Sequence, residues 1–200
     1  MCPPPEDSSS RLTHPAALSE FSRQERSLLL QLAHQSIAAA LEHREISLVP
    51  PNPHLAEPRG VFTTLYYRGD LRGCVGYVFP VMSLYRMVAE SARGAAFDDS
   101  RFAPVTRDQA AELEVSLSIL SPPQPIRPED VEIGRHGLLI KMGDYRGLLL
   151  PQVPIEHKWD RIAFLEQTCK KAGLPVDAWQ TGAQVEAFTA EIFGDGDVET

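Results

Sequence analysis

The feature that most restricts the fold of this chain is a partial internal repeat. Residues 60–80 align with residues 134–154 without a gap at a shift of 74 positions, and seven of the 21 aligned pairs are identical. Both segments place Gly-Asp between two apolar runs, as many hairpin turns do. Both also carry an Arg-Gly pair just after the turn, which turn chemistry does not explain. These pairs are Arg72-Gly73 and Arg146-Gly147.

The same shift extends the repeat to a later strand-like segment, because residues 112–120 align with residues 186–194. Each copy then has the pattern of two strands, a helix and a strand. We therefore predict an α+β fold, mostly antiparallel sheet with flanking helices, built by internal duplication of a β-β-α-β unit. The two related halves cover about residues 60–120 and 134–194.

Local signals assign the individual elements. Ser22 with Glu25 three residues later is a capping box, and apolar residues then recur at helical spacing as far as Leu41. Four prolines make residues 44–59 an irregular loop. The other expected helices are 81–93, 106–111 and 158–172, and the expected strands are 61–67, 71–79, 114–120, 138–142, 145–150 and 185–193.

Amino-acid composition distinguishes a central domain from the two ends of the chain. Residues 1–18 are rich in Pro and Ser and lack apolar periodicity, so we expect a disordered tail there. The domain covers residues 19–194, and residues 195–200 form a short C-terminal tail. Hydrophobic residues make up 43% of the chain, which is enough for a packed core.

Several function classes are disfavoured by the sequence. The apolar runs are far shorter than the roughly 18 residues of a membrane span, and the N-terminus does not resemble a signal peptide. Cys2, Cys74 and Cys169 form no CxxC pair, which argues against a structural metal site and for a reducing, cytoplasmic compartment. The formal net charge of −8, without a cluster of Lys and Arg, argues against a nucleic-acid partner. The cofactor, if there is one, is unknown at this stage.

The sharpest chemical signal is the segment Leu71–Gly76, which reads LRGCVG. Strand alternation places Arg72, Cys74 and Gly76 on one face. A guanidinium beside a thiol favours the thiolate, so Cys74 is a candidate nucleophile on the wall of a cleft, activated by Arg72. Gly73 and Gly76 bare the backbone for a ligand or for another chain segment. The alternative is that Cys74 only packs, as buried free cysteines do.

Other polar residues complete the candidate site. His136, at the start of a strand in the second half, is a candidate for proton transfer with Cys74. A histidine in such a place is also commonly a surface residue or a local hydrogen-bonding group. Asp99 and Arg101 form either a charged rim to the cleft or a solvated loop. Arg146, in the second copy of the Arg-Gly pair, is a further binding candidate.

The Leu71–Gly76 segment closely resembles the LRGCIG signature of the AMMECR-type domain family, with Val75 in place of Ile. Other segments resemble the family in the same order, and together they span about residues 19 to 194. They include GVFT at 60–63, DSRF and PVT within 99–106, EVS and LSPP within 114–123, IGRHGL at 133–138 and RGLLLPQV at 146–153.

The resemblance implies an α+β fold and a cytosolic protein. It also implies company, because bacterial and archaeal members are described as protein A of the AmmeMemoRadiSam system, beside a Memo-like protein and a radical S-adenosylmethionine protein. It implies no reaction. Two functions therefore stay open. One is an enzyme, or an enzyme component, that uses Cys74 to modify a small molecule or macromolecule. The other is a non-catalytic binding or scaffold protein in which Cys74 only packs.

Overall fold

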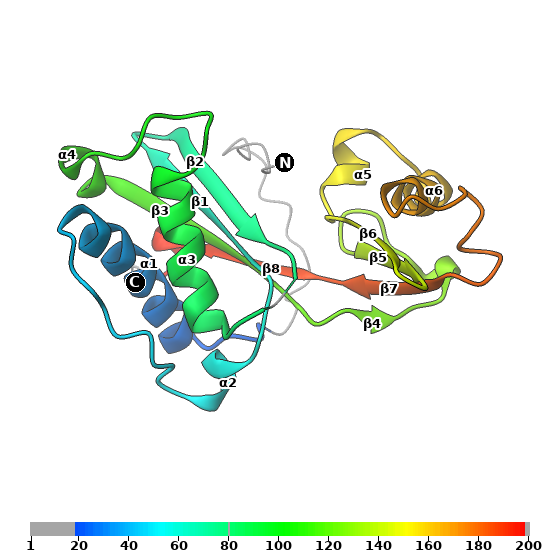
Figure 1. Cartoon of the computed structure of the whole chain (residues 1–200), viewed down its shortest axis with the longest axis horizontal. Coiled ribbons are helices and arrows are strands. Elements are labelled where there is room, and N and C mark those ends of the chain that lie inside the picture. The colour runs from blue at the N-terminus through cyan, green and yellow to red at the C-terminus, as the bar shows by residue number, and fades with distance from the viewer. Residues whose placement is uncertain (1–18, 80, 199–200) are drawn as a thin grey trace. The chain divides into compact units, whose positions relative to one another are not determined.

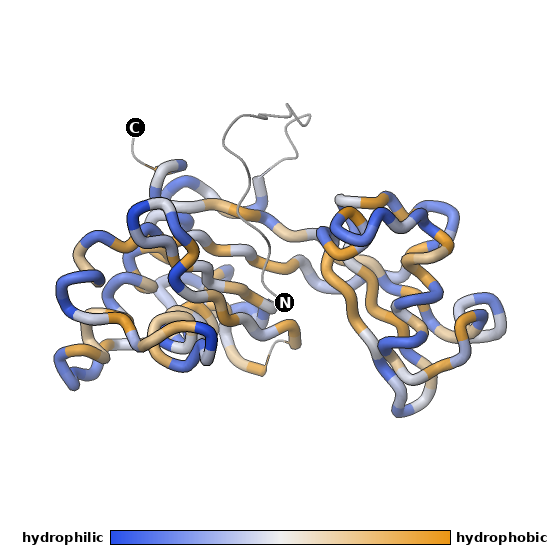
Figure 2. Tube along the Cα trace, turned by 90° about the horizontal axis from the view of Figure 1, so that it is seen from above, coloured by the Kyte–Doolittle hydropathy of each residue, from blue (hydrophilic) through white to orange (hydrophobic). Residues whose placement is uncertain are grey.

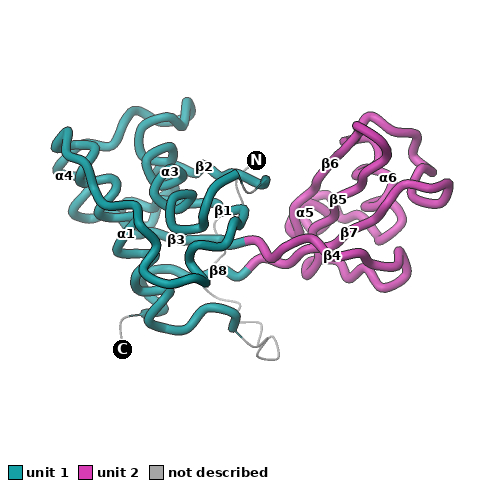
Figure 3. Tube along the Cα trace, turned by 60° about the horizontal axis from the view of Figure 1, so that its bottom comes forward, with its two compact units in different colours: residues 1–119, 191–200 teal, residues 120–190 magenta. Residues whose placement is uncertain are grey.

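The computed structural model describes residues 19–79 and 81–198 (Figure 1). The predicted disordered tail, 1–18, lies outside the described residues. The chain forms two compact units (Figure 3). The first unit includes the described residues up to Ile119 and those from Glu191 onwards, and the second is Leu120–Ala190. The first unit is therefore completed by a segment that follows the second unit in the sequence.

The first unit is built on a four-stranded sheet in the order β2-β1-β3-β8. β1 pairs antiparallel with β2 on one side and with β3 on the other. Arg68 and Gly69 both have positive φ, 54° and 84°, between β1 and β2, which suits a tight hairpin and agrees with the predicted turn. The strands are β1 (Val61–Tyr67), β2 (Asp70–Tyr77), β3 (Leu113–Leu120) and β8 (Ala190–Gly194).

Two long helices, α1 (Arg23–Leu41) and α3 (Leu84–Phe97), cover one face of this sheet (Figure 1). The predicted capping box opens α1, since Ser22 and Glu25 bind each other's backbone N–H groups. The short helix α4 (Arg107–Ala110) follows its predicted cap, Thr106. The loop expected at 44–59 contains one helical turn, α2 (Pro53–Ala56), because the Asn52 side chain caps it and a proline suits its first position.

The second unit has its own four-stranded sheet, in the order β4-β7-β5-β6. β5 pairs antiparallel with β6 and with β7. Its core contains Leu138, Phe164 and Cys169, which all have exposed fractions of 0%. The elements are β4 (Gln124–Pro125), η1 (Pro128–Asp130), β5 (Gly137–Met142), β6 (Tyr145–Leu149), α5 (Val153–Glu156), α6 (Arg161–Lys171) and β7 (Gln184–Phe188).

The prediction of one strand over residues 185–193 is wrong. β7 ends at Phe188 in the second sheet and β8 begins at Ala190 in the first. Between them, the N–H of Thr189 donates to Ser121 Oγ at 3.0 Å, and Thr189 O accepts from the N–H of Ser121 at 2.9 Å. Apolar alternation indicates a half-buried strand, but it does not say with which sheet that strand pairs.

The α+β class with mostly antiparallel sheet is confirmed, whereas the duplication stays a prediction. The orders β2-β1-β3 and β6-β5-β7 have the same connectivity. The third strand of each sheet, however, does not follow the 74-residue offset. Thr63 of β1 pairs with Leu117 of β3, whereas Gly137 of β5, 74 positions after Thr63, pairs with Phe188 of β7, which lies only 71 positions after Leu117.

Hydrophobic residues recur along the helices and strands of both units (Figure 2), and the buried ones form one core cluster in each unit. No helix in the described part of the chain is long and apolar enough to cross a membrane. The segment expected to be a C-terminal tail, 195–200, begins with the short helix η2 (Asp195–Asp197). Asp195 accepts hydrogen bonds from the backbone N–H of Val115 at 2.7 Å and contacts His34 Nε2 at 2.9 Å, so its side chain is anchored in the first unit.

Candidate functional site

The Leu71–Gly76 segment lies in β2, at one edge of the first sheet. Cys74 stands opposite Thr64 of β1. Its backbone N–H donates to Asp99 Oδ2 at 2.8 Å. The edge of a sheet presents unpaired N–H groups, which other chains can bind. The Asp99 carboxylate closes this position of the edge from within the same unit.

The Cys74 side chain belongs to the sheet face opposite α3. Thr63 faces that helix, since its hydroxyl lies 2.7 Å from the hydroxyl of Ser91, and neighbouring strand residues point to the other face. Thr64 Oγ1 donates to Cys74 Sγ at 3.3 Å, and Cys74 is only 6% exposed. The sulfur is disulfide-bonded in this structure, so a nucleophilic thiol exists only in the reduced protein.

Arg72 lies at an irregularity that interrupts the expected strand alternation. The β1–β2 register shifts between Leu65 and Tyr66, which leaves Arg72 without a partner position in the pairing. Its Nη2 donates to Ala103 O at 2.7 Å and to Gln109 Oε1 at 3.0 Å. These bonds join Arg72 to the loop after α3 and to α4. Because the strand pairing is interrupted at Arg72, alternation does not determine on which face of the sheet its side chain lies.

Gly73 and Gly76 are both in close contact with their own unit. A side chain on Gly73 would collide with the backbone carbonyl of Ala95 in α3, and one on Gly76 would collide with the ring of Phe62. Another segment of the same chain therefore lies close to each glycine, which was one of the two expectations for them.

Asp99 lies beside β2, with a side chain that is 7% exposed. Arg101 donates to it from its backbone N–H at 3.2 Å, from Nε at 2.9 Å and from Nη2 at 2.7 Å. These bonds from Arg101 hold the pKa of the Asp99 carboxyl well below its usual range, although burial opposes them, and the Cys74 N–H adds to the effect. The result is a fixed negative charge at the sheet edge.

His136 and Arg146 lie in the second unit. His136 Nδ1 accepts a hydrogen bond from the backbone N–H of Glu132 at 3.0 Å. Burial lowers the pKa of His136, which favours the neutral ring. This contact fits the local hydrogen-bonding interpretation of that histidine. Arg146 is exposed on β6, where it pairs across the strands with Lys141.

Two residues that contact the Leu71–Gly76 segment were missed by sequence reasoning. Thr64 becomes visible only with the strand register, because nothing in its own sequence neighbourhood indicates a contact to sulfur. Gln109 could have been found from the sequence, because it occupies the third helical position after the N-cap Thr106. In a capping box, the side chain at that position accepts a hydrogen bond from the N–H of the cap residue. The same Gln109 oxygen also accepts from Arg72.

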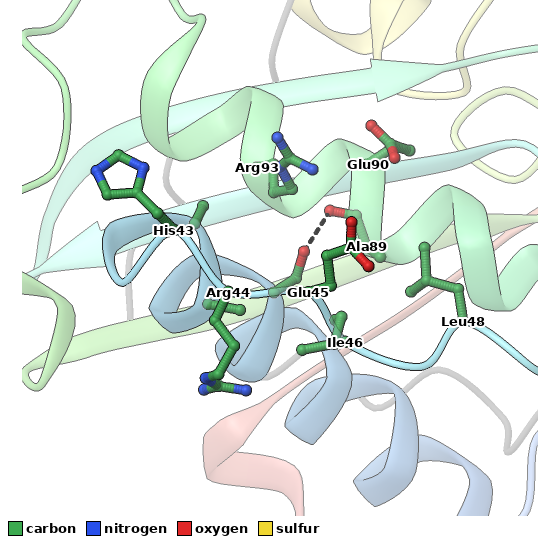
Figure 4. A pocket seen from close by; sticks show the side chains of 11 residues that line it. His43, Arg44, Glu45, Ile46, Leu48, Ala89, Glu90 and Arg93 are labelled. Carbon is green, nitrogen blue, oxygen red and sulfur yellow. Dashed lines mark hydrogen bonds between the residues drawn. The ribbon is translucent and has the colours of Figure 1, made fainter.

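An open pocket of about 530 Å³ lies elsewhere in the first unit, between α1, the segment after it, and α3 (Figure 4). It is lined by Ser36, Ala39, Ala40, His43, Arg44, Glu45, Ile46, Leu48, Ala89, Glu90 and Arg93. Within the residues that the structure describes, no group of three or more His, Cys, Asp or Glu side chains is arranged to hold a metal ion.

Comparisons with known proteins point to one family. The AMMECR1 family model matches residues 30–193. A protein of Thermococcus gammatolerans is 43% identical over 180 residues, which is 82% of this chain and 87% of that protein. A protein of Aquifex aeolicus is 38% identical over 175 residues, 82% of this chain and 90% of its own. The crystal structure of the uncharacterized protein PH0010 from Pyrococcus horikoshii matches with a TM-score of 0.64 and 40% identity, covering 84% of this chain and 89% of that one.

Proposed function

We propose that this chain, which belongs to the AMMECR1 family, is a non-catalytic binding or scaffold protein in which Cys74 packs. The observation that supports this proposal is the engagement of the Leu71–Gly76 segment in internal contacts. Asp99 binds the Cys74 backbone, and Phe62 fills the space beside Gly76. The residues of the segment therefore act as a structural junction between β2, α3 and the loop that follows α3.

The chemistry around the sulfur also favours packing over catalysis. A cysteine nucleophile needs a base within hydrogen-bond reach, or a cation that lowers the pKa of the thiol. In the reduced protein, the Thr64 hydroxyl that donates to Sγ would remain beside it, and a hydroxyl is no base near neutral pH. Arg72 is the nearest candidate cation in the sequence, and its hydrogen bonds go to Ala103 and Gln109.

Alkylation of the reduced protein tests this proposal. We would replace Cys2 with Ser and Cys169 with Ala, reduce the protein fully, and follow iodoacetamide labelling of Cys74 against urea concentration. A packed Cys74 labels at a rate that rises with the unfolded fraction. Labelling in native buffer at the rate of a small free thiol, near pH 7, would overturn the proposal. A Cys74→Ser version of the same protein shows the background.

The enzyme hypothesis is the second candidate, and the Thr64 contact is what favours it. A hydroxyl that donates to sulfur stabilises a thiolate. In this role, the reduced Cys74 would modify a small molecule or macromolecule, alone or as an enzyme component. Thr64→Val then raises the pH at which half of Cys74 is reactive. A pH profile that is the same in Thr64→Val and in the parent protein would count against this role.

We also propose the partners that the family resemblance implies, a Memo-like protein and a radical S-adenosylmethionine protein, and with them a cytoplasmic location. The direct test is to mix the purified proteins from one organism and measure the eluted mass by size-exclusion chromatography with light scattering. A binding or scaffold role predicts a complex with at least one of them. Separate elution of all components at concentrations around 10 µM, where interactions of ordinary affinity are populated, would argue against direct binding.

A further inference from the structure

The pocket between α1 and α3 owes its space to small residues. Ser36 Oγ donates to Ala89 O at 2.9 Å, which links the two helices, and both residues line the pocket. Ala39 and Ala40 of α1 line the same region. Side chains of this size let the helices approach and leave an open volume of about 530 Å³ above them. That volume lies in the range of small-molecule sites, roughly 300–1,000 Å³.

One wall of the pocket is apolar. Ile46 and Leu48 follow the end of α1, are partly buried and pack against the core of the first unit. Both side chains also line the pocket (Figure 4). An aliphatic group that enters the pocket would therefore remove apolar surface from water.

The rim carries charges of both signs. Glu90 and Arg93 come from α3, and Glu45 comes from the segment after α1 (Figure 4). Each of these three side chains lacks a hydrogen bond or ion pair to any other described residue. Arg44 differs from them, because its Nε donates to Glu42 at 3.0 Å. Besides His43 and the paired Arg44, two carboxylates and one guanidinium without such a partner thus border a single open space beside an aliphatic wall.

We propose that this pocket binds a small zwitterion of the amino-acid class with an aliphatic side chain. The ammonium group of the ligand faces Glu45 and Glu90, and its carboxylate faces the guanidinium of Arg93, whose planar fork suits a carboxylate. The side chain lies against the wall of Ile46 and Leu48. A simple anion would leave the two carboxylates without a partner, and a simple cation would leave Arg93 without one.

This inference goes beyond the proposed function. The pocket shares no lining residue with the Leu71–Gly76 segment. The result of the Cys74 experiments and the result at this pocket are therefore separate.

Three related probes test the recognition chemistry. L-Leucine has both charges, L-leucinamide lacks the carboxylate and N-acetyl-L-leucine lacks the ammonium group. Isothermal titration calorimetry on the full chain should show saturable binding of L-leucine. Each of the other two should bind at least about tenfold more weakly, because a charge-assisted hydrogen bond is lost. The absence of saturable L-leucine binding, or equal affinity for all three probes, overturns the proposal.

Variants then locate the binding site. Arg93→Gln should raise the dissociation constant of L-leucine about tenfold while leaving L-leucinamide unaffected. Arg86→Gln is the matched control, since Arg86 is exposed on the same helix and does not line the pocket. Ala40→Leu should abolish binding by filling the space, and Ala40 is partly exposed, so the fold should tolerate the change. Equal affinities of Arg93→Gln and Arg86→Gln for L-leucine, or unchanged binding by Ala40→Leu, would place the ligand elsewhere.

Discussion

The Asp99 carboxylate accepts a hydrogen bond from the backbone N–H of Cys74 at 2.8 Å, across 25 positions of sequence. The bond fastens the loop after α3 to the free edge of β2. Because Arg101 holds the same carboxylate, two motifs that are separate in the sequence form one structural junction. Asp99 and Arg101, which are site candidates in the sequence, thus have a structural role in covering the edge strand β2.

Asp99→Ala should destabilise the protein by about 1–3 kcal/mol, because the part-buried N–H of Cys74 loses its acceptor and Arg101 loses its hydrogen bonds to the carboxylate. Asp99→Asn keeps one acceptor oxygen and should lose less. Urea unfolding followed by far-UV circular dichroism measures both. Asp98→Asn is the control, since Asp98 is exposed, and it should stay within about 0.5 kcal/mol of the parent. Equal stability of Asp99→Ala and Asp98→Asn would contradict the junction.

Gly73→Ala and Gly147→Ala should each destabilise the unit that contains them, by about 1–3 kcal/mol or more, because the new methyl group overlaps backbone atoms. The obstacle is the Ala95 carbonyl for Gly73 and the backbone of Ala172 for Gly147. Gly196→Ala is the control, because nothing lies within 4 Å of its added methyl group. Thermal unfolding by calorimetry compares the three. If Gly73→Ala unfolds at the same temperature as Gly196→Ala, α3 does not approach β2 this closely.

Much of the local structure could be predicted from short-range chemistry. The capping box at Ser22 and the hairpin turn at Gly69 work through neighbours in sequence, so the residues themselves carry the signal. Gly173, with φ of 75°, ends α6 for the same reason. These elements lie within one or a few residues of their predicted bounds.

The orientation of Arg72 and the division of the last strand could not be predicted in this way. Strand alternation assumes regular pairing, and the register shift beside Tyr66 removes that assumption at Arg72. The break at Thr189 depends on two sheets that compete for one stretch of chain, which a single sequence does not reveal. The packing roles of Gly73 and Gly76 likewise depend on Ala95 and Phe62, whose positions come from the tertiary fold.

Arg72→Ala separates a structural arginine from an activating one. If Arg72 serves the fold, the variant loses about 1–3 kcal/mol of stability, since Ala103 O and Gln109 lose a charged donor. The pH at which half of the reduced Cys74 is reactive should then stay unchanged. Alkylation rates between about pH 6 and pH 10, which bracket an ordinary thiol, supply that value. Arg72→Lys keeps the charge and serves as the control, and a rise of the half-reactive pH in Arg72→Ala alone would support the enzyme hypothesis.

The pairing of His54 with Glu25 should give the first unit a stability maximum in mildly acidic solution. Burial raises the pKa of Glu25, but hydrogen bonds from His54, Ser22 and Asn52 outweigh it and lower that pKa from 4.5 to about 2. The stabilisation that ionised Glu25 contributes to the folded state is therefore present above pH 4.5 and is lost as the pH falls towards 2. Burial lowers the pKa of His54, but the bond to Glu25, 2.9 Å from Nδ1, outweighs it and raises the pKa above 6.5. That contribution is complete below pH 6.5 and is lost as the pH rises through the raised value.

His54→Gln should therefore remove the fall in the free energy of unfolding that the parent protein shows as the pH rises. That fall is on the order of 1 kcal/mol for a charge-assisted bond of this kind. Urea midpoints measured from about pH 5 to about pH 9, a range that spans histidine titration, reveal the difference. His43→Asn is the control, because His43 is exposed and Asn tolerates its φ of 53°. If the midpoint of His54→Gln falls with rising pH as steeply as that of His43→Asn, the ion pair between His54 and Glu25 is not what links stability to pH in this range.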